Sequence, residues 1–498
     1  MSLDNIKQRL TTLSQNSPHL HELLSKERLK RYHSRTSFLN YYYGFSQLTD
    51  EGLDLLEKAA HETQVFEHLN KLLSGEKINT SENRAVSHHN CRNPETGYYQ
   101  KNQKQALSLG NRVFTNDLNN NSTPYKTIVQ IGIGGSELGP KAIYHALHSM
   151  LSSEKTARFI ASIDPVGFRE TLSTTSIEDC LFVIVSKSGS TFETTENINQ
   201  LREYIETNGH TWQSIQNQVV VITCPSSTLD QSDLGHHRLY MSESIGGRFS
   251  VTSPVGTFIL TCCFGEKIVL DFLNGAYEHD QSSTNHSLSK NPSLTAALVS
   301  YWERCYLNYN SQAIISYSHA LKVIPSHLQQ LFCESLGKHH TIDNKHLKTP
   351  SGKLVFGEEG PNAQHSFFQL LHQGDTIIPV QFLSIRSPLV ESDAPYHKGL
   401  VHSMTSQIHA LAYGKEHTDA PHQFLGNRPS TTVLIETLSP QSLGALASFY
   451  ENMVFFEGIL LNINTFDQPG VELGKSVMRQ LNEKETPEIL SELALLLQ

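Results

Sequence analysis

Two turns rich in glycine and hydroxyl side chains stand where the sequence predicts a strand to end and a helix to begin. The first is GIGGSELGP at 132–140, with Gly135 and Ser136 near its centre, and the second is SKSGST at 186–191. Such turns present free backbone N–H groups and the positive end of a helix dipole to an anion. Serine and threonine hydroxyls add further donors. Two such turns in consecutive strand–helix units predict a site for one phosphate monoester.

Other ligands fit these turns less well. A dinucleotide fingerprint needs a third glycine where Glu137 stands, and that carboxylate would repel a pyrophosphate. A nucleoside-triphosphate loop would end in Gly-Lys-Ser or Gly-Lys-Thr, which neither turn contains. An ordinary serine-rich helix cap without a ligand stays open for each turn taken singly, since serine and threonine favour cap positions.

Four further side chains suit proton transfer or the stabilisation of an anion. Arg248 follows two glycines in GGRFS, where it could anchor a developing negative charge or form a structural ion pair. Glu334 lies among apolar neighbours, where desolvation could tune a general base, although a solvated glutamate is commoner. His365 stands at a predicted helix start, a position for an acid–base imidazole or for a cap. Lys475 lies near the chain end, where a solvated lysine is the default.

Histidine is abundant, with 26 residues, but its spacing does not predict a metal site. The sequence contains no HExxH motif and no Cys/His spacing of the structural zinc kind. His402 and His409 lie seven residues apart on one predicted helical face, which is more often surface than ligand. We therefore expect no metal in the site.

Length, charge and composition restrict the class of protein. The chain has 498 residues with 39 basic and 49 acidic side chains, and a net charge of −10 argues against a nucleic-acid partner. A hydrophobic fraction of 38% and a charged fraction of 18% can build large buried cores. No apolar run suits a membrane helix, and the first residues lack signal-peptide features. Seven thinly spread cysteines without a CxxC pair predict reduced thiols in a cytoplasm.

Strands alternate with helices in two stretches of the chain, which predicts parallel sheets covered on both faces. In the first stretch we expect strands at 127–133, 158–163, 181–185 and 219–223. In the second we expect strands at 313–317, 354–356, 376–385 and 432–438. The expected α/β organisation is a helical N-terminal segment, two α/β domains and a helical C-terminal tail, over 1–120, 121–280, 290–465 and 466–498 respectively. The segment 280–292, rich in serine and asparagine, is the expected linker.

Six segments, taken in order, resemble the signature segments of the glucose-6-phosphate isomerase (phosphoglucose isomerase) family. They are GIGGSELGP, SKSGSTFET, GGRFS, CESLGK, GEEGPNAQH and DQPGVELGK, and the match runs from Glu82 to Lys475. The resemblance implies two sugar-isomerase (SIS-type) domains, each a parallel sheet flanked by helices, in a homodimer with the active site near the subunit interface. It implies reversible isomerisation of glucose 6-phosphate and fructose 6-phosphate through a cis-enediol(ate), a step of glycolysis and gluconeogenesis, without a cofactor.

The resemblance also implies a role for each site residue. The phosphate would be held by Gly135, Ser136, Ser186, Lys187, Ser188 and Thr191. Glu334 would be the base, with Gln330 beside the substrate. Arg248 would stabilise the enediolate, and Lys475 would be the remaining cationic catalytic group.

Ring opening would need a second acid–base group, because the sugar arrives as a closed ring. His365, oriented by Glu193, would open the ring and would act in the site of the neighbouring subunit. Leu336 and Ala363 stand where the family has asparagine and glycine, and these departures remove no reacting group. The alternative is a non-catalytic sugar-phosphate-binding protein of the same fold, which would keep the phosphate hydroxyls but need no base.

Overall fold

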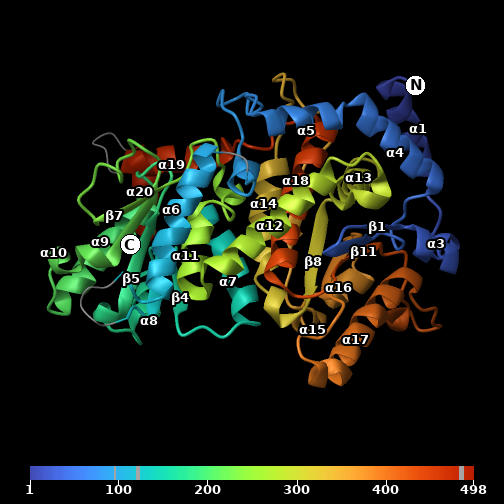
Figure 1. The fold of residues 1–498 in the computed structure, drawn as a ribbon. Coiled ribbons are helices and arrows are strands. Elements are labelled where there is room, and N and C mark those ends of the chain that lie inside the picture. The colour runs from blue at the N-terminus through green and yellow to red at the C-terminus, as the bar shows by residue number, and fades with distance from the viewer. Residues whose placement is uncertain (95–96, 119–123, 482–486, 498) are drawn as a thin grey trace.

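A computed structural model describes residues 1–94, 97–118, 124–481 and 487–497 of the chain. It contains two sheets, each flanked by helices, and further helices at both ends of the chain (Figure 1). The expected α/β fold is therefore confirmed. Among the described residues, no helix is long and apolar enough to cross a membrane.

The first sheet has five parallel strands in the order β4-β3-β5-β6-β7. Their bounds are Thr127–Ile131 for β3, Thr156–Ile160 for β4, Cys180–Val185 for β5, Val219–Thr223 for β6 and His237–Tyr240 for β7. The chain passes from β3 to β4 on one side and continues at β5 on the other. The loops that follow β3 and β5 therefore diverge, and such a switch point opens a crevice at the carboxyl edge of the sheet.

The second sheet has six strands in the order β1-β2-β11-β10-β8-β9. Their bounds are His33–Arg35 for β1, Leu39–Tyr42 for β2, Ser311–Tyr317 for β8, Leu354–Phe356 for β9, Val380–Ile385 for β10 and Ser430–Ile435 for β11. The last four are parallel, and the β1–β2 hairpin is added antiparallel beside β11. The expectation of a helical segment over 1–120 is therefore incomplete, because this hairpin belongs to the second sheet.

Helices cover both sheets and connect them. In the N-terminal part they are α1 Leu3–Gln15, α2 Leu20–Leu23, α3 Lys26–Arg31, α4 Asp50–Glu62, α5 Val65–Ser74 and α6 Gly97–Phe114. Around the first sheet they are α7 Leu138–His148, α8 Pro165–Leu172, α9 Phe192–Thr207, α10 Trp212–Ile215 and α11 Pro254–Phe264. The rest are α12 Glu266–Ser283, α13 Pro292–Cys305, α14 Ile324–Leu336, α15 Gly360–Gln364, α16 Phe368–Gln373, α17 Ala394–Tyr413, α18 Pro440–Leu461, α19 Gly470–Leu481 and α20 Glu488–Leu497.

Helix α18 lies at the centre of the molecule, where it packs against α12, α13 and α14 (Figure 1). Nearly all of its residues are buried, and a capping box of Ser439 and Ser442 fixes its start. One hydrophobic cluster contains residues of both sheets, for example Leu181 of β5 and Leu383 of β10. The two halves of the chain therefore share a core. The connection between α12 and α13 covers only residues 284–291, so the expected linker is shorter than predicted. The domain boundaries stay a prediction.

Candidate active site

Both predicted phosphate loops leave the same edge of the first sheet, because β3 and β5 are adjacent parallel strands. In the loop after β5, Ser186 Oγ lies 2.9 Å from Thr191 Oγ1 and accepts the Gly189 N–H at 3.1 Å. Gly189 has a φ of +74°, and a Cβ there would lie 2.5 Å from Leu229 N, so only glycine fits this turn. The hydroxyls are thus held at the N-terminus of α9, a 16-residue helix whose dipole favours an anion.

The other residues predicted for the phosphate site lie on the same loops. Ser136 is half-buried and begins the approach to α7, while Ser188 is exposed and its Oγ accepts the Ser190 N–H at 3.2 Å. Lys187 donates from Nζ to the Ile245 carbonyl at 3.0 Å, and burial lowers the pKa of its ammonium group. Its hydrogen bond therefore anchors the loop after β5 to the segment that leads to Arg248.

The first loop also contacts the segments that carry the proposed catalytic groups. A Cβ on Gly135 would lie 2.0 Å from the carbonyl carbon of Gly247, so the two backbones touch. Ser250 Oγ donates to the Gly135 carbonyl at 3.2 Å. Gly134 has a φ of +62°, and a Cβ there would lie 3.0 Å from Gln330 Nε2 on α14. Phosphate loop, GGRFS segment and α14 thus meet at one place.

We expect Gly135→Ala to remove most of the activity and to lower the unfolding temperature. The added methyl group would overlap the Gly247 backbone, and such overpacking costs about 1–3 kcal/mol. Gly167→Ala on α8 is the matched control, since a Cβ there meets nothing within 4 Å and should be neutral or slightly stabilising. Thermal unfolding and turnover of both variants test this. Equal stability and turnover in the two would contradict the close approach.

Arg248 is the most heavily bonded side chain of the site and is only 1% exposed. Its Nη1 donates to Glu334 Oε2 at 3.1 Å and to Gln468 Oε1 at 2.8 Å. Its Nε donates to Ser335 Oγ at 2.6 Å, and its Nη2 donates to two carbonyls of the segment 465–467. Burial lowers the pKa of the guanidinium while the Glu334 carboxylate opposes that shift, and an arginine stays charged in proteins.

Glu334 lies in the last turn of α14 with its side chain 27% exposed. One carboxylate oxygen accepts from Arg248, and the other accepts from Gln330 Nε2 at 3.1 Å, one helical turn earlier. Among the described residues, Gln330 Oε1 is buried without a partner, which leaves an acceptor for a hydroxyl group. Glu334 and Gln468 also line a cavity of about 640 Å³, a size typical of small-molecule sites. The carboxylate is therefore oriented and accessible from a cavity.

Two residues with no role in the sequence prediction support this arrangement. Lys338 Nζ donates to the Glu334 carbonyl at 2.9 Å and to Asp467 Oδ1 at 2.8 Å, and burial lowers its pKa. Gln468 shares Nη1 of Arg248 with Glu334. Both lie inside quoted motifs, CESLGK and DQPGVELGK, and that position was the only sequence signal for them.

Helix α14 runs antiparallel to its neighbouring strand β9. Pro325, at the start of α14, lies beside Gly357, which follows β9. A Cβ on that glycine would be 3.0 Å from the proline side chain. Gly337, just after the end of α14, lies against Gly352, which precedes β9. A Cβ on Gly352 would be 3.1 Å from the Gly337 backbone. Glu334 therefore lies near the amino ends of β8 and β9.

His365 lies at the opposite end of these strands. It is exposed and follows α15, whose Gly360 packs on the ring of Tyr317 at the carboxyl end of β8. The seven residues of β8 alone span about 20 Å. This chain therefore does not bring His365 to its own Glu334. Glu193, its predicted orienting partner, is half-buried in the first turn of α9, and its carboxylate makes no hydrogen bond within the described residues.

The backbone of Lys475 lies in α19, but its side chain is outside the described part of the structure. Its position relative to Glu334 stays a prediction. Ala363 and Leu336, which replace the glycine and asparagine of the family pattern, are both buried and carry no polar group.

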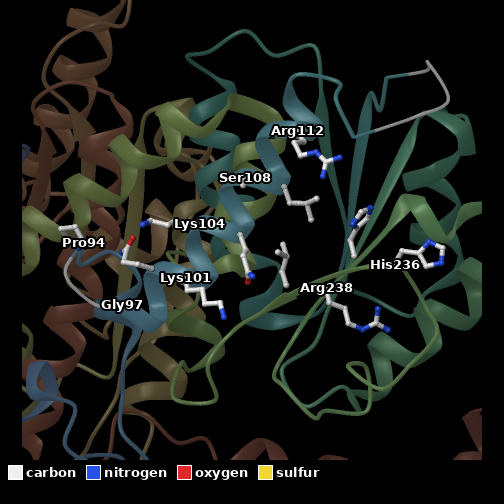
Figure 2. A pocket seen from close by; sticks show the side chains of 13 residues that line it. Pro94, Gly97, Lys101, Lys104, Ser108, Arg112, His236 and Arg238 are labelled. Atoms are coloured by element: carbon white, nitrogen blue, oxygen red, sulfur yellow. The ribbon is translucent and has the colours of Figure 1, made fainter.

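A larger groove, of about 860 Å³, lies away from these residues between α6 and β7 (Figure 2). Basic side chains border it, among them Lys101, Lys104, Arg112 and Arg238. None of the predicted catalytic or phosphate-binding residues lines it. The size of a cavity alone therefore does not mark the site that the motifs predict.

Comparisons with known proteins agree with these motifs. Residues 42–492 match the sequence model of the family described as phosphoglucose isomerase. The glucose-6-phosphate isomerase of Borreliella burgdorferi (strain ZS7) is 38% identical over 466 residues, which cover 89% of this chain and 88% of the relative. That of Treponema denticola is 36% identical over 484 residues, covering 94% and 92%. The crystal structure of a glucose-6-phosphate isomerase from Chlamydia trachomatis superposes with a TM-score of 0.90 at 30% identity and covers 99% of this chain and 98% of that one.

Proposed function

The chain belongs to the phosphoglucose isomerase family and interconverts glucose 6-phosphate and fructose 6-phosphate, and we propose that Glu334 is the base of this reaction. The carboxylate would take a proton from one of the two carbons C1 and C2 and return it to the other. The observation that carries the proposal is its orientation by Gln330 and Arg248 at the edge of a cavity. One carboxylate can serve both transfers when the sugar is held still, since orientation alone supplies up to ~7–11 kcal/mol.

Arg248 would stabilise the negative charge of the enediolate intermediate. When the base removes a proton, charge develops on the sugar oxygens, and a fixed cation in a water-poor site lowers the energy of that state. Arg248 is buried and 3.1 Å from the Glu334 carboxylate, and an arginine stays charged in proteins, so it would lie beside the reacting carbons of a sugar bound at Glu334. The unpartnered Gln330 Oε1 would accept a sugar hydroxyl. Lys475 would add a second cation.

The loops after β3 and β5 would hold the phosphate of the substrate. Gly135 and Ser136 supply backbone and hydroxyl donors from the first loop, and Ser186, Ser188 and Thr191 supply hydroxyls from the second. The N-terminus of α9 adds its dipole. Contacts of the first loop with Gln330 would then set the distance between the phosphate and the base.

We expect Ser186→Ala and Thr191→Ala to raise KM for fructose 6-phosphate more than they lower kcat. Each change deletes a hydrogen bond to a charged group worth ~1.5–3 kcal/mol, which corresponds to roughly ten- to hundredfold weaker binding. Thr195→Ala is the control. The Thr195 hydroxyl donates to the Thr191 carbonyl at 3.1 Å, within α9, and has no predicted role in phosphate binding. Steady-state kinetics measure the effect, and an unchanged KM in both loop variants would contradict the phosphate assignment.

We further propose that the active unit is a homodimer in which His365 opens the sugar ring in the site of the other copy. The support is its position: it is exposed, at the far end of β8 from Glu334. In a two-fold dimer, reciprocal donation generates two equivalent composite sites. Glu193 would orient the imidazole there.

The reaction moves a proton without net oxidation, so the proposed mechanism needs no nicotinamide. Arg248 and Lys475 would supply the positive charge that a metal could otherwise provide. All seven cysteines are free thiols, which fits the proposed cytoplasmic location. A coupled assay that converts fructose 6-phosphate to glucose 6-phosphate and oxidises the product tests the activity directly. Binding of the phosphosugar without turnover would support the non-catalytic alternative instead.

A further inference from the structure

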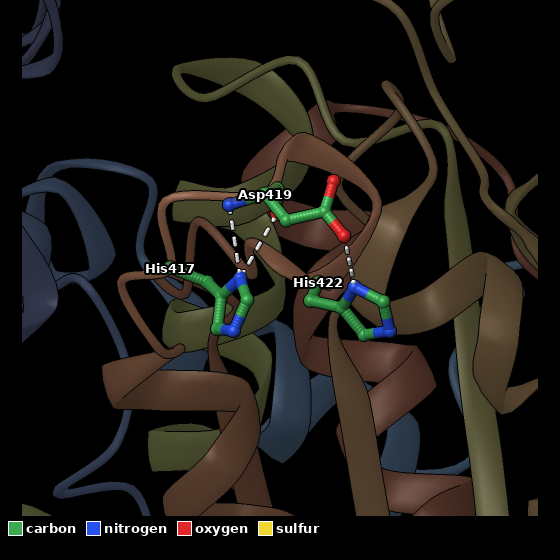
Figure 3. A group of neighbouring side chains, drawn as sticks. All are labelled: His417, Asp419 and His422. Atoms are coloured by element: carbon green, nitrogen blue, oxygen red, sulfur yellow. Dashed lines mark hydrogen bonds and ion pairs between the residues drawn. The ribbon is translucent and has the colours of Figure 1, made fainter.

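His417, Asp419 and His422 form a group in the exposed loop that follows α17 (Figure 3). One ligand atom from each lies within 4.8 Å of the other two. Asp419 Oδ2 lies 2.8 Å from His422 Nδ1, and the Asp419 N–H donates to His417 Nδ1 at 3.0 Å. Both rings thus turn their Nδ1 atoms toward the aspartate. The spacing His-x-Asp-x-x-His is neither HExxH nor a Cys/His zinc pattern, so the sequence did not predict it.

The loop that carries these side chains is closed at its base by contacts that do not involve them. Lys415 and Phe424 exchange two backbone hydrogen bonds, of 2.8 and 2.9 Å. Gly414 has a φ of +66°, and a Cβ there would lie 2.2 Å from the Phe424 carbonyl oxygen.

A second anchor comes from α16. Gln373, its last residue, donates from Nε2 to the carbonyls of Pro421 and Gln423, both at 3.1 Å. These bonds hold the backbone on either side of His422. The backbone that carries the three side chains is therefore ordered before an ion binds, which lowers the entropic cost of binding.

We propose that His417, Asp419 and His422 bind one divalent transition-metal ion of the zinc class, a site beyond the isomerase reaction. Two imidazoles and one carboxylate are ligands that Zn²⁺ prefers, whereas Mg²⁺ and Ca²⁺ prefer oxygen ligands alone. At a Zn–N distance of about 2.1 Å, tetrahedral ligand atoms lie about 3.4 Å apart. The present separations of up to 4.8 Å close to that value by rotation of side chains that are all exposed.

On binding, the ion would take the place of the proton between His422 Nδ1 and Asp419 Oδ2, and that proton would pass to the solvent. His417 Nδ1 would exchange the hydrogen bond that it accepts from the Asp419 N–H for a bond to the ion. Three protein ligands leave a fourth position for water, as in open zinc sites. No residue of this loop lines the cavity beside Glu334. The ion would therefore hold the loop together and would leave turnover unchanged.

The full-length protein, freed of metal with a chelator, tests this by calorimetric titration with Zn²⁺ and by the absorption of bound Co²⁺. We expect one equivalent per chain with a tetrahedral Co²⁺ spectrum, and no binding of Mg²⁺. His417→Gln and His422→Gln should lose that equivalent or weaken it by about tenfold or more. Asp419→Asn, which keeps the size of the side chain, should weaken it as well.

The matched control is the double variant His61→Gln, His286→Gln. These two exposed residues have ring centroids 6.4 Å apart and do not line the cavity beside Glu334, and no carboxylate of the described residues completes them as a ligand set. The control should keep the bound equivalent, and all variants should keep full turnover with fructose 6-phosphate, which shows that they are folded. Retention of the equivalent in the His417 and His422 variants, or its loss in the control, would overturn the proposal.

Discussion

Glu334→Gln is expected to abolish isomerisation, with kcat falling by about 10³-fold or more, while the phosphosugar still binds. Glutamine has nearly the same shape. Its amide oxygen still accepts from Arg248, and its NH2 group can donate to Gln330 once that amide turns its unpartnered Oε1 toward it. Its amide cannot accept the proton that leaves the sugar carbon. Steady-state turnover of fructose 6-phosphate and calorimetric binding of the same sugar separate the two effects.

The control for this change is Glu203→Gln, an exposed carboxylate on the same chain in α9. It should leave both turnover and binding unchanged. A Glu334→Gln enzyme with near-wild-type turnover would remove Glu334 from the mechanism. Loss of binding together with turnover would instead indicate a role in holding the sugar.

A mixture of two inactive variants is expected to regain activity if His365 serves the neighbouring subunit. Homodimers of Glu334→Gln and of His365→Ala should each be nearly inactive. When they are unfolded and refolded together, each heterodimer has one site with both lesions and one site with neither. Random pairing at equal input makes about half of the dimers mixed, so activity should approach a quarter of the wild-type value.

Heterodimer formation must be measured independently, for example by two different affinity tags. The control is a mixture of Glu334→Gln with Arg248→Ala, since these side chains contact each other within one chain and belong to the same site. Each heterodimer of that mixture carries the Glu334 lesion in one site and the Arg248 lesion in the other, so no site is intact and no activity should return. Verified heterodimers of Glu334→Gln and His365→Ala without activity would place His365 in the same site as its own Glu334.

The strands that position the phosphate loops could be predicted because they are buried on both faces. The residues of β3 and β5 are all buried, and such strands are continuous apolar runs. Edge strands lack this signal. β7 buries only Leu239 of its four residues. The strands of the β1–β2 hairpin have only three and four residues, and polar side chains interrupt them, so no apolar run marks the hairpin either.

The positions of the chemical groups could be predicted from their motifs, but their contacts could not. Arg248 bonds to residues 86 to 220 positions away in the chain, which only the packing of α14 and of the segment 465–468 decides. Gln468 and Lys338 gain their roles from that packing and have no local pattern. The His417 group likewise depends on a loop closure between Lys415 and Phe424, which no apolar periodicity reports.

The most direct test of proton transfer by Glu334 is isomerisation of fructose 6-phosphate in deuterium oxide, followed by nuclear magnetic resonance. The wild-type protein should give glucose 6-phosphate with deuterium at C2, because a proton held on the carboxylate exchanges with solvent before it returns. Glu334→Gln should show no deuterium in the sugar after the same time. Incorporation by Glu334→Gln at the wild-type rate, or turnover of the wild-type protein with no deuterium at C2, would contradict the proposed mechanism.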